Sequence, residues 1–144
     1  MSGQILLVAG LPGSGKTTLL SGLEKEGWLS FDDFKAGAFF DSPKLRNARR
    51  YSDLLKSLKA GGNCVVADID FCNNVPRAEA KSVILTEVPD LALNWLFFAP
   101  DVNACLVNIE RQNRPSKAAH IEALYKYARL YVVPPWATTK SVEN

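Results

Sequence analysis

The residues best suited to chemistry lie in one stretch, residues 10–17, which reads Gly-Leu-Pro-Gly-Ser-Gly-Lys-Thr. The stretch is an uninterrupted G-x-x-x-x-G-K-[ST] pattern, in which glycines let successive backbone N–H groups turn inward onto a phosphate chain. Lys16 would bring positive charge to the β- and γ-phosphates, and the Thr17 hydroxyl would bind Mg²⁺. The pattern therefore predicts a site for a nucleoside triphosphate or a similar polyphosphate. The residues expected to contact it are Gly10, Pro12, Gly13, Ser14, Gly15, Lys16, Thr17 and Thr18.

The chain around this pattern has the order that an anion site requires. An apolar run over residues 4–9 precedes it and is typical of a buried parallel strand. Residues 17–26 follow with leucines at helical spacing, and Gly27 is a good helix C-cap. Strand, glycine-rich loop and helix N-terminus in succession direct the loop amides and the helix dipole at one anion. A glycine-rich turn that binds nothing is the less favoured alternative.

Short apolar runs and amphipathic stretches alternate along the rest of the chain. Strands are expected at residues 28–31, 64–67 and 91–99, and residues 132–136 either end the regular structure or begin a short final strand. Helices are expected at residues 44–60, 77–88, 101–112 and 117–130. This alternation predicts an α/β fold of three layers, with helices on both faces of a mainly parallel sheet of four to five strands. At 144 residues the chain, residues 1–144, is expected to form a single domain.

Carboxylates follow two of the expected strands. Asp32 and Asp33 come after the second strand, and Asp68 and Asp70 come after the third. Since ligands bind outside the carboxyl ends of the strands in such sheets, these side chains should share an edge with the phosphate loop. Asp68 is expected to hold Mg²⁺, directly or through water, or else to be a helix N-cap or turn residue. Asp70 either caps the following segment or faces the acceptor.

One of the earlier carboxylates is a candidate general base. A carboxylate on the acceptor side of the γ-phosphate can take the proton from an attacking hydroxyl. Adjacent side chains on an extended segment point to opposite sides, so only one of Asp32 and Asp33 should face the site. We favour Asp32 as the catalytic base, although strand alternation does not decide between the two.

Two arginines lie near the end of the expected helix at residues 101–112. Arg111 and Arg114 are three residues apart, so we expect them on one helix face. A guanidinium fork suits the equatorial oxygens of a transferred phosphoryl group better than an ammonium does. Both arginines are therefore expected to neutralise charge during phosphoryl transfer. The alternative is that they only complement the helix dipole.

These features together resemble the P-loop kinases of the AAA-type and polynucleotide-kinase-like group, which includes 5′-hydroxyl polynucleotide kinases and zeta-toxin-like proteins. The Pro-Gly-Ser-Gly core of residues 10–17 resembles that group's phosphate loop. Residues 31–35 (Phe-Asp-Asp-Phe-Lys) resemble its Asp-Asp-aromatic-basic segment, in which the first Asp is the general base. Residues 65–68 are similar to the strand whose final Asp lies beside the acceptor, and residues 111–114 resemble the lid arginines, within a short lid.

The resemblance implies a P-loop NTPase fold, ATP as phosphoryl donor, Mg²⁺ as cofactor and a hydroxyl group as acceptor. It also implies a last strand beneath the nucleotide base, which would come from residues 137–142 or be absent. We therefore expect an enzyme, an ATP-dependent phosphotransferase that moves the γ-phosphoryl group of ATP·Mg to a hydroxyl acceptor. Selectivity between ATP and GTP stays open.

Two other functional classes compete with this interpretation. The first is a P-loop ATPase or GTPase acting on a partner, but the Asn-Lys-x-Asp motif is absent after the fourth expected strand and no Asp-Glu pair ends the third. The second is a non-catalytic ATP-binding module. Against it stands the presence of every residue type that the chemistry needs, namely Lys16, Thr17, Asp32, Asp68 and Arg111.

Composition narrows the range of acceptors. The net charge is +2 and no basic stripe is present, which argues against a long nucleic-acid acceptor and favours a small molecule or a nucleotide end. A set of basic and aromatic residues could line an acceptor cleft, since aromatic rings stack on bases, or could form a hydrophobic seam. This set is Arg49, Arg50, Phe34, Phe39 and Phe40.

The sequence also indicates a cytoplasmic protein with no membrane partner. No apolar stretch approaches the ~20 residues that cross a bilayer, and the N-terminus has no signal-peptide pattern. Cys64 and Cys105 have apolar neighbours and are expected to be buried, reduced thiols. His120 has no companion at metal-ligand spacing and is expected on a helix surface.

Overall fold

The computed structural model describes residues 3–31 and 48–143, and the side chains of the second stretch from residue 53 onward. Five strands form one sheet in the order β2-β3-β1-β4-β5, and every adjacent pair is parallel. The strands are β1 (Gln4–Ala9), β2 (Leu29–Phe31), β3 (Asn63–Ala67), β4 (Ala92–Phe98) and β5 (Thr139–Lys140). The mainly parallel α/β sheet expected from the alternation of elements is therefore confirmed.

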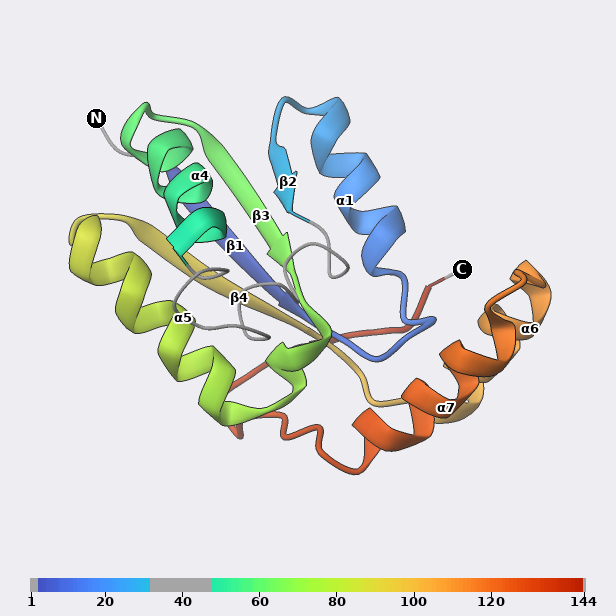
Figure 1. Cartoon of the computed structure of the whole chain (residues 1–144). Coiled ribbons are helices and arrows are strands. Elements are labelled where there is room, and N and C mark those ends of the chain that lie inside the picture. Colours follow the sequence, from blue (N-terminus) through green and yellow to red (C-terminus); the bar gives the residue numbers. More distant parts are fainter. Residues whose placement is uncertain (1–2, 32–47, 144) are drawn as a thin grey trace.

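Helices cover both faces of this sheet (Figure 1). They are α1 (Lys16–Lys25), α4 (Ala48–Lys59), α5 (Asn74–Glu87), α6 (Val102–Gln112) and α7 (Lys117–Ala128), with a 3-10 turn, η2 (Ile69–Cys72), after β3. Helices α4 and α5 share one face and α1 lies on the other, whereas α6 and α7 pack together beyond the carboxyl ends of the strands (Figure 1). The pair α6 and α7 therefore stands beside the loop between β1 and α1.

Strand β1 is central because it has parallel partners on both edges. Leu7 of β1 stands opposite Val66 of β3 on one side and Trp95 of β4 on the other. Its side chains enter two cores, since Leu7 clusters with residues of α4 and α5, and Val8 clusters with Leu20 of α1. A strand buried on both faces reads as a continuous apolar run, which is why the sequence revealed it.

The observed elements agree with the expected ones to within a few residues at their ends. Helix α5 begins three residues earlier than expected, at Asn74, because the Asn73 side chain caps it by accepting a hydrogen bond from the N–H of Val75 at 3.0 Å. The final strand β5 is present and falls within residues 137–142, which settles the alternative that the family resemblance left open, namely that this strand is absent. Helix α6 begins after Asp101, whose carboxylate accepts from the N–H of Ala104 at 3.0 Å.

Helix α6 buries a polar side chain on its inner side. Val107 is half exposed, whereas the neighbouring Asn108 is buried. Residues three and four positions apart lie on the same helix face, and Asn108 and Ile109 therefore lie on the same buried face as Cys105. A polar side chain thus occupies a core position.

A tyrosine side chain contacts the ends of two neighbouring strands at the carboxyl edge of the sheet. The Tyr131 hydroxyl lies 2.6 Å from the carbonyl oxygen of Phe98, at the end of β4, and 3.3 Å from that of Ala9, at the end of β1. Burial raises the pKa of Tyr131, so the hydroxyl keeps its proton through the neutral range. One hydroxyl thereby links the ends of β1 and β4 at the point where the loop between β1 and α1 begins.

The three cysteines are buried and reduced, as was expected for Cys64 and Cys105. Burial raises the pKa of the Cys64 thiol to about 11, and burial reinforced by nearby Asp101 raises that of Cys105 to about 11. Of the described helices, none is long and apolar enough to traverse a lipid bilayer.

Stability should fall at alkaline pH because of these thiols. In the unfolded chain a thiol ionises at about pH 8.5, whereas Cys64 and Cys105 keep their protons in the folded chain up to a pKa of about 11. The folded chain then binds more protons than the unfolded chain within this window, so the free energy of unfolding decreases as pH rises through it. Urea unfolding curves recorded from pH 8 to 11 measure the slope.

The variant Cys64→Ala provides the comparison. It should be less stable at pH 8, because it leaves a small cavity, but its stability should depend less steeply on pH than that of the wild type. Parallel profiles for the two proteins would contradict this explanation.

Candidate phosphate-binding site

The loop between β1 and α1, called the phosphate loop below after the pattern of residues 10–17, is tightly wound. The N–H of Ser14 donates to the carbonyl of Leu11 at 3.1 Å, and Gly13 and Gly15 have φ angles of +83° and +109°. Only glycine adopts such angles readily, which explains the glycine at both positions. The first α-helical hydrogen bond of α1 runs from the N–H of Leu19 to the carbonyl of Gly15 at 3.0 Å. Helix α1 therefore begins directly after the loop and directs the positive end of its dipole toward it.

Lys16 is held inside this loop. Its side chain is only 8% exposed, and its ammonium group donates to the carbonyl oxygen of Gly10 at 2.6 Å. The Ser14 hydroxyl is buried, and no partner for it is found in residues 3–31 and 48–143. A buried hydroxyl without a partner is costly unless something else supplies one. The loop therefore holds a cation and an unused hydroxyl at the same place.

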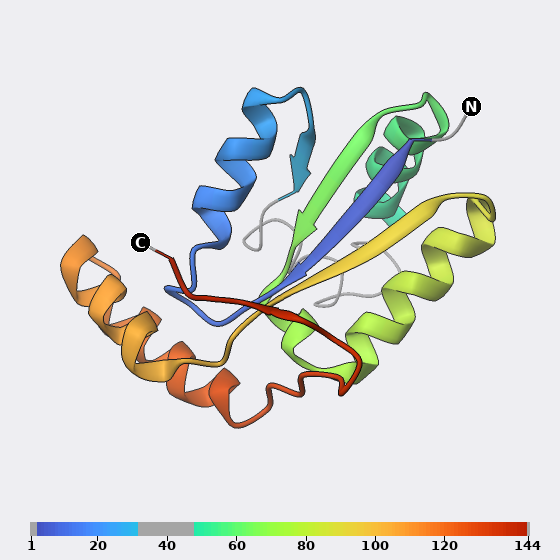
Figure 2. The ribbon, with the colours of Figure 1, turned by 180° about the vertical axis from the view of Figure 1, so that it is seen from behind.

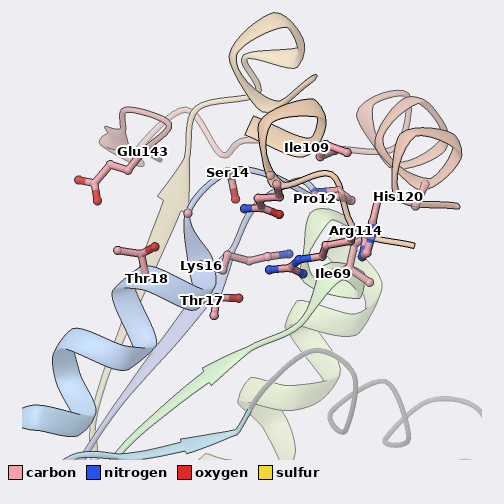
Figure 3. Close-up of a pocket in the computed structure, with 14 residues that line it drawn as sticks. Pro12, Ser14, Lys16, Thr17, Thr18, Ile69, Ile109, Arg114, His120 and Glu143 are labelled. Carbon is pink, nitrogen blue, oxygen red and sulfur yellow. The ribbon is translucent and has the colours of Figure 1, made fainter. Parts of the chain in front are cut away.

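A cavity of about 520 Å³ opens over the loop (Figure 3). Its lining comes from the phosphate loop and the start of α1, from η2, from α6 and α7, and from the C-terminal segment. The residues are Pro12, Gly13, Ser14, Gly15, Lys16, Thr17, Thr18, Ile69, Ile109, Gln112, Arg114, His120, Ala123 and Glu143. Every expected phosphate-contacting residue except Gly10 is in this set, and Gly10 binds Lys16 instead.

The two arginines behave differently from each other. Arg114 lines the cavity, and Figure 3 shows its guanidinium extending toward Lys16 and Thr17. Arg111 is not among the described residues that line it. The expectation that both share a helix face is wrong, because α6 ends at Gln112 and Asn113 takes a left-handed conformation with φ +46°. The reversal at Asn113 places Arg114 outside the helix and over the loop.

Asp68 lies at the carboxyl end of β3, beside the start of the phosphate loop. Its N–H donates to the carbonyl of Val8 at 3.4 Å, and its Oδ1 accepts from the N–H of Asp70 at 2.8 Å. The side chain is fully buried and caps η2, so the N-cap alternative for Asp68 is confirmed. Asp68 is not among the described residues that line the cavity, so the structure brings it beside the loop and not into the cavity itself. Asp70 faces α7, where the Tyr127 hydroxyl lies 3.4 Å from its Oδ1.

The candidate bases Asp32 and Asp33 lie outside the described residues, as do Phe34, Phe39 and Phe40 of the suggested acceptor cleft, and the side chains of Arg49 and Arg50 are likewise not described. Strand β2 runs parallel to β3 as far as Phe31, which stands opposite Val66. The chain therefore leaves β2 at the same edge of the sheet as Asp68. In the part of the chain that the structure describes, no cluster of three or more acidic, histidine or cysteine side chains could hold a metal by itself.

Six lining residues were not identified from the sequence as part of the site. They are Ile69, Ile109, Gln112, His120, Ala123 and Glu143. His120 lies on the surface of α7, as expected, and its ring lines the cavity next to Arg114 (Figure 3). Its Nδ1 lies 3.1 Å from the Ser116 hydroxyl. His120 lies on the first turn of α7. The approach of α7 to the loop is a tertiary contact, which cannot be predicted from the residues near His120 in the sequence. Glu143 reaches the cavity from the opposite side and pairs with Lys140 at 2.7 Å.

The phosphate loop and α6 touch at Gly13. A Cβ atom placed on Gly13 would lie 2.5 Å from the backbone carbonyl oxygen of Cys105 and 3.0 Å from the side chain of Ile109. Backbone cannot give way as a flexible side chain can, so the loop would have to move away from α6. The contact therefore excludes every other residue at this position.

Replacing Gly13 should disable the site. We expect Gly13→Ala to lower the free energy of unfolding by about 2 kcal/mol or more, from left-handed strain and the backbone clash, and to abolish nucleotide binding. Gly22→Ala is the matched control, since Gly22 lies inside α1 and a Cβ there would meet nothing within 4 Å. This control should raise stability by about 0.5–1 kcal/mol. Chemical unfolding and nucleotide titration measure both effects, and normal binding by Gly13→Ala would refute the argument.

No protein-family model matches the chain, and no curated protein matches it. Solved structures do match. A protein designated APE1195 superposes with a TM-score of 0.64 at 19% identity, covering 99% of this chain and 86% of that one. A gluconokinase from Sinorhizobium meliloti 1021 gives a TM-score of 0.62 at 13% identity, covering 99% of this chain and 84% of its own.

A chain of the Pnkp1/Rnl/Hen1 RNA repair complex is also similar. Its TM-score is 0.58 at 15% identity, and the match covers 92% of this chain but 48% of that chain. This protein therefore has the α/β fold of P-loop kinases. Identities of this size establish the fold, and the chemistry must be argued from the site.

Proposed function

We propose that this protein is an ATP-dependent phosphotransferase that moves the γ-phosphoryl group of ATP·Mg to a hydroxyl acceptor. The observation that carries the proposal is the meeting of Lys16 and Arg114 over one cavity. Lys16 belongs to the phosphate loop and Arg114 to the segment between α6 and α7, so two cations reach the cavity from different elements. Charge that builds up on a transferring phosphoryl group needs stabilisation of this kind.

The loop amides and Lys16 would bind the phosphate chain of the donor. The start of α1 adds its dipole, and the lining contributes positive charge from Lys16 and Arg114. The one carboxylate of the described lining, that of Glu143, is engaged by Lys140. The electrostatic balance over the loop thus favours an anion with several charges.

The residues present fit a magnesium ion bound together with phosphates. Mg²⁺ usually keeps several waters and takes one or two protein ligands alongside substrate phosphates, so a dedicated carboxylate cluster is not needed. Thr17 lines the cavity and would offer its hydroxyl, and Asp68, buried behind the loop, would act on the ion through water. The ion would neutralise charge on the β- and γ-phosphates.

Asp32 is proposed as the base that accepts the proton of the attacking hydroxyl, in keeping with the family resemblance. Arg114 would stabilise the equatorial oxygens during transfer, and His120 beside it adds a further polar group to that side of the cavity (Figure 3). Arg111 would add positive charge from farther away, since it is not among the described residues that line the cavity.

Two kinds of acceptor follow from the structural neighbours and the charge. The match to a gluconokinase suggests a small polyhydroxyl compound, and the match to an RNA repair complex suggests a nucleic-acid end. The net charge of +2 favours a small molecule or a short nucleotide end over a long strand.

Transfer from γ-labelled ATP with Mg²⁺ to a panel of acceptors tests the proposal. The panel holds sugars and sugar acids, nucleosides, nucleotides and 5′-hydroxyl oligonucleotides. A labelled acceptor is expected, and its labelling should be abolished by Lys16→Met. Arg114→Ala should lower kcat by about a thousandfold, as for other arginines that stabilise transferred phosphoryl groups, and Asp32→Asn by about a hundredfold or more.

Arg129→Ala is the matched control, because Arg129 is an exposed arginine at the far end of α7 and does not line the cavity. It should retain wild-type rates. Arg111→Ala should cost less than Arg114→Ala. Release of label only as free phosphate, at the same rate in Asp32→Asn, would instead point to a hydrolase.

A further inference from the structure

A buried asparagine joins three parts of the molecule that are distant in sequence. Asn108 of α6 is 5% exposed, and its side-chain nitrogen donates to the carbonyl of Gly13 at 2.9 Å and to the carbonyl of Glu143 at 2.7 Å. The N–H of Glu143 in turn donates to the carbonyl of Ser14 at 3.0 Å. Phosphate loop, α6 and C-terminal segment are thus connected in a closed ring of hydrogen bonds.

Both views of the ribbon place the C-terminal segment against the phosphate loop (Figures 1 and 2). The approach is close, since a Cβ atom placed on Gly15 would lie 3.1 Å from the Cβ of Glu143. Strand β5 delivers the segment to this position by pairing with the end of β4. The segment therefore contacts the loop along its backbone, and not only through the Glu143 side chain.

The ring fixes the direction of two successive peptide groups in the loop. In a planar trans peptide the C=O and the following N–H point in opposite directions. Holding the Gly13 carbonyl at Asn108 turns the N–H of Ser14 the other way, where it donates to Leu11. Holding the Ser14 carbonyl at Glu143 likewise turns the N–H of Gly15 away from the C-terminal segment.

Glycines make such control necessary. Gly13 and Gly15 each accept positive and negative φ with little penalty, so the peptides between them can rotate when nothing holds their carbonyls. A rotated peptide would aim a carbonyl oxygen at the phosphates and repel them. An amide group with two N–H donors suits this task because it can satisfy two carbonyls at once.

We infer that Asn108 is a positioning residue, which holds the phosphate loop in the conformation that binds phosphate by anchoring it to the C-terminal segment. This inference rests on the proposed function, because it concerns how strongly the loop binds a phosphate chain. Asn108 itself does not line the cavity. Replacing a residue that acts through the loop should weaken the binding of every ligand with a phosphate chain, whether or not the ligand carries a base.

Calorimetric titration with Mg·ATP and with Mg·tripolyphosphate tests the inference. Asn108→Leu keeps the size of the side chain and removes both donors, so its Kd should rise at least about tenfold for both ligands and by a similar factor. Asn103→Leu is the matched control, since Asn103 is exposed on the same helix, and its Kd values should equal those of the wild type. If Asn108→Leu does not fold, Asn108→Ser takes its place with the same expectation.

Hydrogen exchange of the ligand-free protein supplies a second readout. Asn108→Leu should accelerate exchange in residues 10–18 and 141–143 together, while exchange in α5 stays as in the wild type. Wild-type Kd values for Asn108→Leu would overturn the inference. If the wild type binds neither ligand, the proposed function fails instead. Hydrogen exchange is then the remaining test. Faster exchange in both residues 10–18 and residues 141–143 of Asn108→Leu would support the positioning of the loop by Asn108, and unchanged exchange would refute it.

Discussion

The phosphate loop and α6 approach so closely at Gly13 that no side chain fits between them, and the other parts of the site are placed by this contact. It sets the distance between the loop and the helix pair α6 and α7, which brings Arg114 and His120 over the same cavity as Lys16. The contact itself depends on β1, whose two parallel neighbours and the Tyr131 hydroxyl fix the point at which the loop begins. Because a protein interior is close-packed, a shift of the loop at this contact would also shift the elements packed against it.

The parts of the fold that could be predicted from the sequence depend on residues that are close together along the chain. Strands buried on both faces show as apolar runs, and the phosphate loop shows as glycines whose positive φ angles are a local backbone requirement. The start of α5 was displaced by three residues because the cap at Asn73 was not recognised from the sequence. Asp68 was correctly placed at a strand end, because its position needed only the order of the elements.

The parts that the sequence did not reveal depend on contacts between distant segments. His120 and Glu143 reach the cavity because α7 and the C-terminal segment fold back onto the loop, and neither carries a motif. Arg114 was paired with Arg111 by helical spacing, which fails once Asn113 reverses the chain. Asn108 gave a signal that could have been used, since a polar residue at helical spacing from Cys105 and Ile109 calls for a buried partner.

The left-handed Asn113 separates the placement of Arg114 from the anchoring of α6. Asn108 ties α6 to the loop, so α6 cannot swing as a rigid body without breaking buried hydrogen bonds. The position of Arg114 over the cavity therefore depends on the φ and ψ angles of Asn113, the first residue after the helix. A change at this one residue would turn Arg114 relative to the loop and leave the hydrogen bonds of Asn108 in place.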